Sequence, residues 1–308
     1  MSLLSPKISA VTDQKSMTTV AQVLTQNDGP TYSFEFFPPK TEQGTANLMQ
    51  AVEELEPLKP DFVSVTYGAS GTNRDRTLGV TFELAKRSNL RVIGHITCTA
   101  QSVDEIKAAI DAYAEAGITN ILAIRGDMPG GPRVAWEKHP KGLSNATELV
   151  ELIKSRGDFC VGVGAFPDGH LTSDFDLDAQ ILLGKQQAGA EFAVTQLFFE
   201  PKHYFDLVER VRKVGVTMPI VPGIMPVSSV KQLGKFVELS GADIPARVAE
   251  TLLHVPDDPM MVRVAGSVIA SDLCKDMLAG GAPGLHFYTQ NRSVATREIL
   301  AMLRARGY

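Results

Sequence analysis

Side chains able to do acid–base or binding chemistry recur directly after short apolar segments of this 308-residue chain. Glu35 is the most informative of them, because it lies inside the aromatic run YSFEFFPP at 32–39. A carboxyl group in such a run is expected to be buried, and an apolar setting raises its pKa toward the range in which a general acid works near neutral pH. Glu35 is therefore the first candidate catalytic residue.

Further candidates follow other apolar segments in the same way: Thr66, Tyr67, His95, Arg125, Asp127, Gln196, Tyr288 and Arg292. For any one of them a structural role is the simpler interpretation. His95, in VIGHITC at 92–98, fits a hydrogen-bonded core histidine equally well. Arg125 and Asp127 can pair across Gly126, although a glycine also lets the backbone approach a ligand closely. Only their joint placement favours a site.

The elements that must position these residues alternate along the chain. Short β-rich segments are predicted at 31–36, 62–66, 91–97, 120–124, 159–165, 192–197, 220–222 and 285–288. Amphipathic helical segments lie between them, for example at 47–58, 103–116, 146–155 and 178–188. Strands separated by helices pair in parallel, and eight such units favour a (βα)8 TIM barrel over an open doubly wound sheet.

The interval from 240 to 283 is too long for one crossover, and two segments in it, 248–255 and 260–278, are helical in pattern. We therefore expect additional helices before strand eight. No composition break marks a second domain, so we predict an N-terminal leader or helix at 1–30 and a single barrel domain at 31–308. In such a barrel, reactive groups project from the carboxyl ends of the strands, which is where the candidates fall.

Composition excludes several classes of function. A net charge of -5 with well-mixed signs argues against nucleic acid as a partner. Three separated cysteines indicate neither a disulfide framework nor a zinc ribbon, and no apolar run is long enough for a membrane span, so a cytoplasmic protein is expected. Dinucleotide GxGxxG, Walker, HExxH and nucleophile-elbow motifs are absent, and no metal site has support.

Seven motifs in order resemble those of the methylenetetrahydrofolate reductase family. They are SFEFFPPK at 33–40, VSVTYGA at 63–69, HITC at 95–98, IRGD at 124–127, VTQLFF at 194–199, VPGIMPVSSVKQ at 221–232 and LHFYTQNR at 285–292. The resemblance covers the chain from about residue 31 onward. It implies a barrel enzyme that holds FAD without a covalent link, accepts hydride from NADH or NADPH and reduces methylenetetrahydrofolate to methyltetrahydrofolate by a ping-pong mechanism, supplying methyl groups for methionine synthesis.

The resemblance also implies roles for individual residues. Glu35 matches the general acid that protonates N10 of the folate, and Asp127 matches an acidic group that stabilises the cationic folate intermediate. Cofactor contacts are implied for Thr66, Tyr67, Ala69, His95, Arg125, Gly126, Asp127, Ala146, Phe166, His170, Asp178 and Lys185. Substrate contacts are implied for Asp127, Gln196, Gln232, Phe236, Tyr288 and Arg292. Departures from the bacterial pattern at Asn145, Phe166 and Ile181 bear on the adenosine side of FAD.

Two competing functions follow from the same residues. A folate or corrinoid methyltransferase would keep a pterin-binding mouth and need no flavin, whereas a silent binding protein would not need the acid at Glu35. By resemblance to bacterial relatives we expect NADH as the hydride donor, a homo-oligomer, and no control by S-adenosylmethionine, because the chain ends just after the eighth helix.

Overall fold

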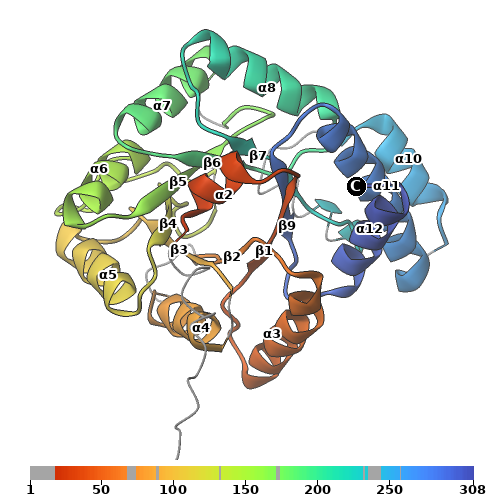
Figure 1. Ribbon diagram of the computed structural model, residues 1–308, viewed down its shortest axis with the longest axis horizontal. Coiled ribbons are helices and arrows are strands. Elements are labelled where there is room, and N and C mark those ends of the chain that lie inside the picture. Colours follow the sequence, from red (N-terminus) through yellow and green to blue (C-terminus); the bar gives the residue numbers. More distant parts are fainter. Residues whose placement is uncertain are drawn as a thin grey trace, which may run out of the picture.

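Parallel strands form a ring at the centre of the computed structural model, and helices surround the ring (Figure 1). The structure describes residues 18–67, 74–87, 90–131, 133–170, 174–231, 233–234, 244–256 and 258–308. Within this part of the chain, no helix combines the length and the apolar character needed to cross a membrane.

The strands are β1 (Thr31–Phe36), β2 (Phe62–Val65), β3 (Val92–Thr97), β4 (Asn120–Ile124), β5 (Cys160–Ala165), β6 (Phe192–Thr195), β7 (Ile220–Val221), β8 (Gly223–Ile224) and β9 (Gly284–Tyr288). They pair in the order β7-β6-β5-β4-β3-β2-β1-β9-β8, with every pair parallel. The predicted TIM barrel is confirmed.

The predicted seventh strand is divided in two at Pro222. Its first half, β7, pairs with β6, and its second half, β8, pairs with β9. Proline has no backbone N–H to donate, so the ladder cannot run through it. The ring therefore closes through one strand that changes partner halfway along.

The helices are α2 (Val20–Gln26), α3 (Glu42–Leu55) with the 3-10 turn η1 (Glu56–Leu58), α4 (Arg74–Arg87), α5 (Val103–Glu115), α6 (Ala146–Arg156), α7 (Phe175–Gln187), α8 (Pro201–Lys213), α10 (Ala246–His254), α11 (Pro259–Ala279) and α12 (Val294–Ala305). Both extra helices expected before the last strand, α10 and α11, are present. Helix α3 begins five residues before its predicted start because the Thr41 hydroxyl accepts the Gly44 N–H.

Alternate strand residues divide the interior into two regions. Outward-facing residues such as Phe34, Phe36 and Phe287 pack against the helices in the main core. Inward-facing residues form a smaller apolar layer in the lumen, made of Phe62, Ile93, Leu122, Cys160, Phe192, Val194 and Val221. Above this layer, towards the carboxyl ends of the strands, the inward residues include the polar Ser64, Glu35 and His95.

Helix α2 seals the apolar layer, and Figure 1 shows it lying across the middle of the ring. Val20 and Leu24 belong to the same cluster as the lumen residues. The Asn120 side chain accepts the Val20 N–H at 2.9 Å, and the Thr19 hydroxyl caps the helix. Part of the expected leader at 1–30 is thus a plug for one end of the barrel.

Removing an apolar side chain of this plug should destabilise the barrel. Leu24→Ala deletes buried methyl groups and leaves a gap in the lumen, so we expect a loss of about 2 kcal/mol in the free energy of unfolding. Leu24→Met keeps the volume and should cost less than about 1.5 kcal/mol. Urea unfolding of both variants measures this, and equal midpoints for the two would show that α2 does not carry the seal.

Candidate active site

The carboxyl ends of the strands surround a cavity of about 460 Å³. Its lining comes from the ends of β1 to β6 and β9 and from α6 and α7, and includes Glu35, Thr66, His95, Arg125, Gly126, Asp127, Asn145, Ala146, Gly164, Phe166, His170, Asp178, Ile181, Lys185, Thr195, Gln196 and Tyr288. These are residues from opposite ends of the sequence. The barrel brings them together because all parallel strands end on the same face.

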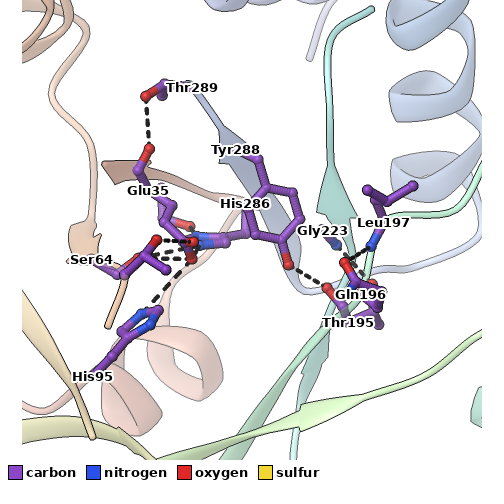
Figure 2. A network of polar contacts seen from close by, with 12 residues as sticks. Glu35, Ser64, His95, Thr195, Gln196, Leu197, Gly223, His286, Tyr288 and Thr289 are labelled. Atoms are coloured by element: carbon purple, nitrogen blue, oxygen red, sulfur yellow. Dashed lines mark hydrogen bonds and ion pairs between the residues drawn. The ribbon is translucent and has the colours of Figure 1, made fainter. Parts of the chain in front are cut away.

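Glu35 lies at the bottom of this cavity in a network of polar side chains (Figure 2). The Thr66 hydroxyl donates to its Oε1 at 2.5 Å, and the Ser64 hydroxyl donates to its Oε2 at 3.3 Å. His286 Nε2 lies 3.2 Å from Oε2, and His95 Nε2 lies 3.8 Å from the same atom. Three other strands thus supply groups that face one carboxylate.

The expected direction of the Glu35 pKa shift was wrong. Burial raises the pKa of this carboxyl, as an apolar setting must. The charge of a protonated His95 and the hydrogen bonds from His286 and Thr66 lower the pKa by more than burial raises it. The result is a pKa of about 2. The sequence showed the aromatic neighbours of Glu35, which face outward, but not the polar groups that meet it across the lumen. Glu35 is therefore ionised at neutral pH in this state.

His286 connects Glu35 to a second hydroxyl. Its Nδ1 lies 2.8 Å from Ser33 Oγ, which can donate to it or accept from it. The hydrogen bond between His286 Nε2 and Glu35 Oε2 is satisfied with the proton on either atom. His286 therefore bridges the Glu35 carboxylate and the Ser33 hydroxyl through its two ring nitrogens.

His95, in the same network, is neutral and makes no hydrogen bond within the described part of the chain, unlike His286. It is fully buried, and both of its ring nitrogens lack a hydrogen-bond partner among the described residues. Burial lowers its pKa to about 4, against the opposing charge of Glu35, so the ring is neutral at pH 7. An unsatisfied neutral imidazole that lines the cavity is a group ready to meet a ligand.

The opposite wall of the cavity carries cationic groups. Lys185 is buried, donates to the Gly164 carbonyl at 3.1 Å, and has its pKa lowered to about 8, first by burial and then by Arg125. Arg125 lies 3.4 Å from His170 Nε2 and stacks over Trp136. Lys185 therefore does not lie on a solvated face of its helix. This wall suits an anion such as a diphosphate.

Asp127 lines the cavity near these cations without pairing to them. No ion pair with Arg125 lies within 4 Å in the described chain, so the simple pairing across Gly126 does not occur. Burial raises the pKa of Asp127, and Arg125 and His170 partly offset this. Gly126 adopts a φ of +81°, which a side chain would strain, and this turn aims the loop at the cavity.

Two features make room for a flat, extended ligand. A Cβ at Gly164, a lining residue, would meet only Ile124 at 3.9 Å and would otherwise project into open space. Gln196 is fixed because its amide oxygen accepts the Leu197 N–H at 2.9 Å, which leaves its amide nitrogen for a ligand. Together with the cationic wall, these residues fit a flavin dinucleotide. In the described residues no group of three potential metal ligands occurs.

Most of the predicted site residues line this one cavity, with a few exceptions. Tyr67 is 3% exposed, and its hydroxyl donates to Gln101 beside the cavity. Arg292 lines an adjoining cleft instead. Ala69, Gln232 and Phe236 lie outside the described residues. Asn145, one of the departures from the family pattern, lines the cavity and caps α6 by accepting the Glu148 N–H.

Sequence reasoning missed the second half of the Glu35 network: Ser33, Ser64 and His286. One signal was available. Polar residues two apart in otherwise apolar strands, such as Ser33 with Glu35 and His286 with Tyr288, share the inward face. A buried strand with polar residues at alternate positions indicates a polar lumen.

The fold and the cavity define a TIM-barrel enzyme scaffold with its site at the carboxyl ends of the strands. A family profile described as methylenetetrahydrofolate reductase matches residues 19–304. The chain belongs to the methylenetetrahydrofolate reductase family, as its motifs indicated.

Individual relatives agree with this. The chain is 36% identical over 275 residues to 5,10-methylenetetrahydrofolate reductase of Escherichia coli, covering 89% of this chain and 90% of that one. It is 36% identical over 278 residues to methylenetetrahydrofolate reductase 1 of Schizosaccharomyces pombe, of which it spans only 46%. An uncharacterized Clostridium thermocellum protein that binds two copies of 5-methyl-5,6,7,8-tetrahydrofolic acid shares the fold, with a TM-score of 0.62, 15% identity, and coverage of 91% of this chain and 96% of that one.

The buried neutral His95 should make the protein less stable in acid. The pKa of His95 is 6.5 in the unfolded chain and about 4 in the folded protein. Between pH 6.5 and pH 4, His95 is therefore protonated in the unfolded state and neutral in the folded state. Stability should be unaffected by this group above pH 6.5 and fall as the pH drops towards 4. Urea midpoints of His95→Gln should depend less on pH than wild type, whereas the exposed control His254→Gln should follow wild type.

Proposed function

We propose that this protein reduces 5,10-methylenetetrahydrofolate to 5-methyltetrahydrofolate, using non-covalently bound FAD and NADH in a ping-pong reaction. The observation that carries the proposal is the Glu35 network at the bottom of a cavity whose other wall is cationic, in a chain of this family. When bound, the flavin would supply reversible two-electron hydride chemistry that no amino-acid side chain provides.

Arg125, Lys185 and His170 would hold the dinucleotide. Two of them carry positive charge at neutral pH, and the third is a half-buried histidine whose lowered pKa keeps it neutral. Asp178 accepts the His170 backbone N–H at 2.7 Å and fixes that loop. Gly164 would let the flat ring system approach the backbone. This arrangement uses the Lys185 side of the cavity and leaves the Glu35 side for the substrate.

Glu35 would donate the proton that the folate needs at N10, and His286 would supply that proton to Glu35. Glu35 is ionised in this state, so it acts as an acid only after it takes a proton, and the bond from His286 Nε2 provides a direct route for one. Displacement of water by a bound folate raises the cost of the carboxylate charge and favours the protonated form. Asp127, on the other side, would stabilise the positive charge that develops on the folate once its ring opens.

One site would serve the two substrates in turn. Thr66 and Gln196 both line the cavity, where either a nicotinamide or a pterin could be hydrogen-bonded. Alternating occupancy of this kind produces ping-pong kinetics. The Arabidopsis thaliana relative, 34% identical, is named as an NADH enzyme, which supports NADH here.

The visible spectrum of the purified protein tests the proposal directly. We expect a yellow protein that is bleached by anaerobic NADH, more readily than by NADPH, and reoxidised by methylenetetrahydrofolate. A colourless protein that neither binds added FAD nor oxidises NADH would contradict the reductase function. It would favour a flavin-independent methyltransferase on the same scaffold.

Glu35→Gln should separate the two half-reactions. Loss of the acid should slow reoxidation by methylenetetrahydrofolate by about 10²- to 10⁴-fold, while bleaching by NADH should change little, because that step needs no proton at N10. Stopped-flow absorbance measures both rates. The exposed residue Glu115 provides a matched control, Glu115→Gln. Equal loss of both half-reactions would mean that Glu35 holds the cofactor and does not serve as the folate acid.

FAD affinity should decrease in mild alkali because of Lys185. A free-state pKa of about 8 means that the ammonium is present below that pH, and an anionic ligand must recover the proton above it. The dissociation constant should therefore be flat below about pH 8 and rise between pH 8 and 9.5. Lys185→Met should bind FAD more weakly with little pH dependence, as measured by flavin fluorescence. A slope that persists in Lys185→Met would assign it to another group.

A further inference from the structure

The strand that carries Glu35 loses one neighbour at the point where Glu35 lies. β1 and β9 pair in register up to Glu35 and Tyr288, and Tyr288 is the last residue of β9. β1 continues for one residue more, to Phe36. On this side of β1, the backbone from the Glu35 carbonyl onward therefore needs hydrogen-bond partners that β9 does not supply.

Thr289 and Asn291, in the loop after β9, supply these partners. The Thr289 hydroxyl and N–H both donate to the Glu35 carbonyl, at 2.7 and 3.2 Å (Figure 2). The Asn291 carboxamide accepts the Phe37 N–H through Oδ1 and donates to the Phe37 carbonyl through Nδ2, each at 2.9 Å. A primary amide presents an acceptor and a donor side by side, as a paired strand residue does. We call Thr289 and Asn291 the β1 clamp.

The conformation of the loop makes the clamp possible. Gln290 and Asn291 both adopt left-handed φ values, 54° and 56°. The Thr289 hydroxyl accepts the Asn291 N–H at 3.2 Å, and the Thr289 carbonyl accepts the Arg292 N–H at 3.0 Å. Asparagine enters the left-handed region more readily than most residues with a Cβ. It therefore meets both requirements at position 291, the turn and the paired amide.

The clamp fixes two groups that meet in the lumen. Glu35 is on β1, whereas His286 is on β9, two residues before Tyr288. The 3.2 Å contact between Glu35 Oε2 and His286 Nε2 therefore depends on how the carboxyl ends of these two strands are held together. The Thr66 hydroxyl, which follows β2 on the other side, sets a second requirement, 2.5 Å from Oε1. Hydrogen bonds weaken steeply away from good geometry, so a loose end of β1 would weaken both contacts.

We propose that Asn291 is a positioning residue for Glu35: its carboxamide holds the end of β1 against β9 and so keeps the carboxyl group in contact with His286 and Thr66. The kinetic part of this inference rests on the proposed function, in which Glu35 is the folate acid. Asn291 acts through the backbone of Phe37. It is not in the lining of the cavity that contains Glu35, and lines the adjoining cleft instead.

Two variants and one control separate positioning from folding. Asn291→Gly keeps the left-handed turn, because glycine adopts positive φ freely, and removes both bonds to Phe37. Thr289→Val has nearly the same shape and removes the hydroxyl bond to the Glu35 carbonyl. Gln290→Gly is the matched control, because it also places glycine at a left-handed position but leaves the clamp intact. Urea unfolding of each variant establishes the conditions under which it is folded.

The ring N–H of His286 is the first measurement, since it needs no reductase activity. In protein labelled with ¹⁵N-histidine at pH 7, the N–H that donates to Glu35 should exchange slowly with water, and His286→Gln identifies its signal. We expect exchange to be about tenfold faster in Asn291→Gly, because the contact opens more often. Thr289→Val should show a smaller change in the same direction, and Gln290→Gly should match wild type.

The two half-reactions are the second measurement. At saturating methylenetetrahydrofolate, Asn291→Gly should be reoxidised about 10- to 100-fold more slowly than wild type, because a displaced acid transfers its proton poorly. Bleaching by NADH and the FAD dissociation constant should stay within about twofold, since neither uses the proton of Glu35. In a Glu35→Gln background, Asn291→Gly should cause no further loss, because it acts only through that carboxyl group.

Each outcome has a distinct meaning. Wild-type exchange of the His286 N–H in Asn291→Gly would overturn the inference, as would rapid exchange in wild type or an unchanged folate half-reaction. Equal losses in both half-reactions and in FAD affinity, or a further loss in the Glu35→Gln background, would show that the clamp supports the fold as a whole and would also overturn it. Faster exchange at His286 in a protein that does not reduce methylenetetrahydrofolate would keep the positioning role and refute the proposed function alone.

Discussion

The charge of Glu35 is buried in the lumen of the barrel, and polar groups on the neighbouring strands stabilise it. An isolated carboxylate removed from water is strongly destabilised, so its neighbours must supply hydrogen bonds and positive charge. Ser64 and Thr66 of the β2 segment and His286 of β9 supply hydrogen bonds to it, and the buried ring of His95 of β3 lies 3.8 Å away. The apolar layer below, closed by α2, excludes water from the other end of the lumen.

The cavity above this network separates two kinds of chemistry. The Glu35 carboxylate and the imidazole groups around it lie on one side, whereas the cationic groups Lys185 and Arg125 line the opposite wall. The separation arises from strand order, since β1, β2, β3 and β9 meet on one side of the ring and β4, β5 and β6 lie on the other. A cofactor and a substrate can therefore occupy adjacent places without competing for the same side chains.

Much of this was accessible from the sequence, because the barrel is built from repeated local patterns. The alternation of apolar strands and amphipathic helices located every strand to within two residues, and the motifs at strand ends located most cavity residues. The features that could not be predicted depend on contacts between side chains of strands that are far apart in the sequence. The direction of the Glu35 pKa shift depends on His286, which is 251 residues away in the chain. Likewise, nothing in the sequence pairs the Asn291 side chain with Phe37, which is 254 residues away, and only the fold shows this contact.

The break at Pro222 has a mechanical consequence. Next to it, the Gly223 N–H donates to the Thr195 hydroxyl at 2.9 Å, and the Tyr288 hydroxyl donates to the Thr195 carbonyl at 2.5 Å, so side chains replace part of the backbone ladder. A Cβ at Gly223 would collide with the same tyrosine ring. Bonds of this kind can open and close by side-chain rotation, whereas a ladder opens only when whole strands separate. The barrel thus has a seam beside its site, where side-chain hydrogen bonds hold the ring together in place of part of the backbone ladder.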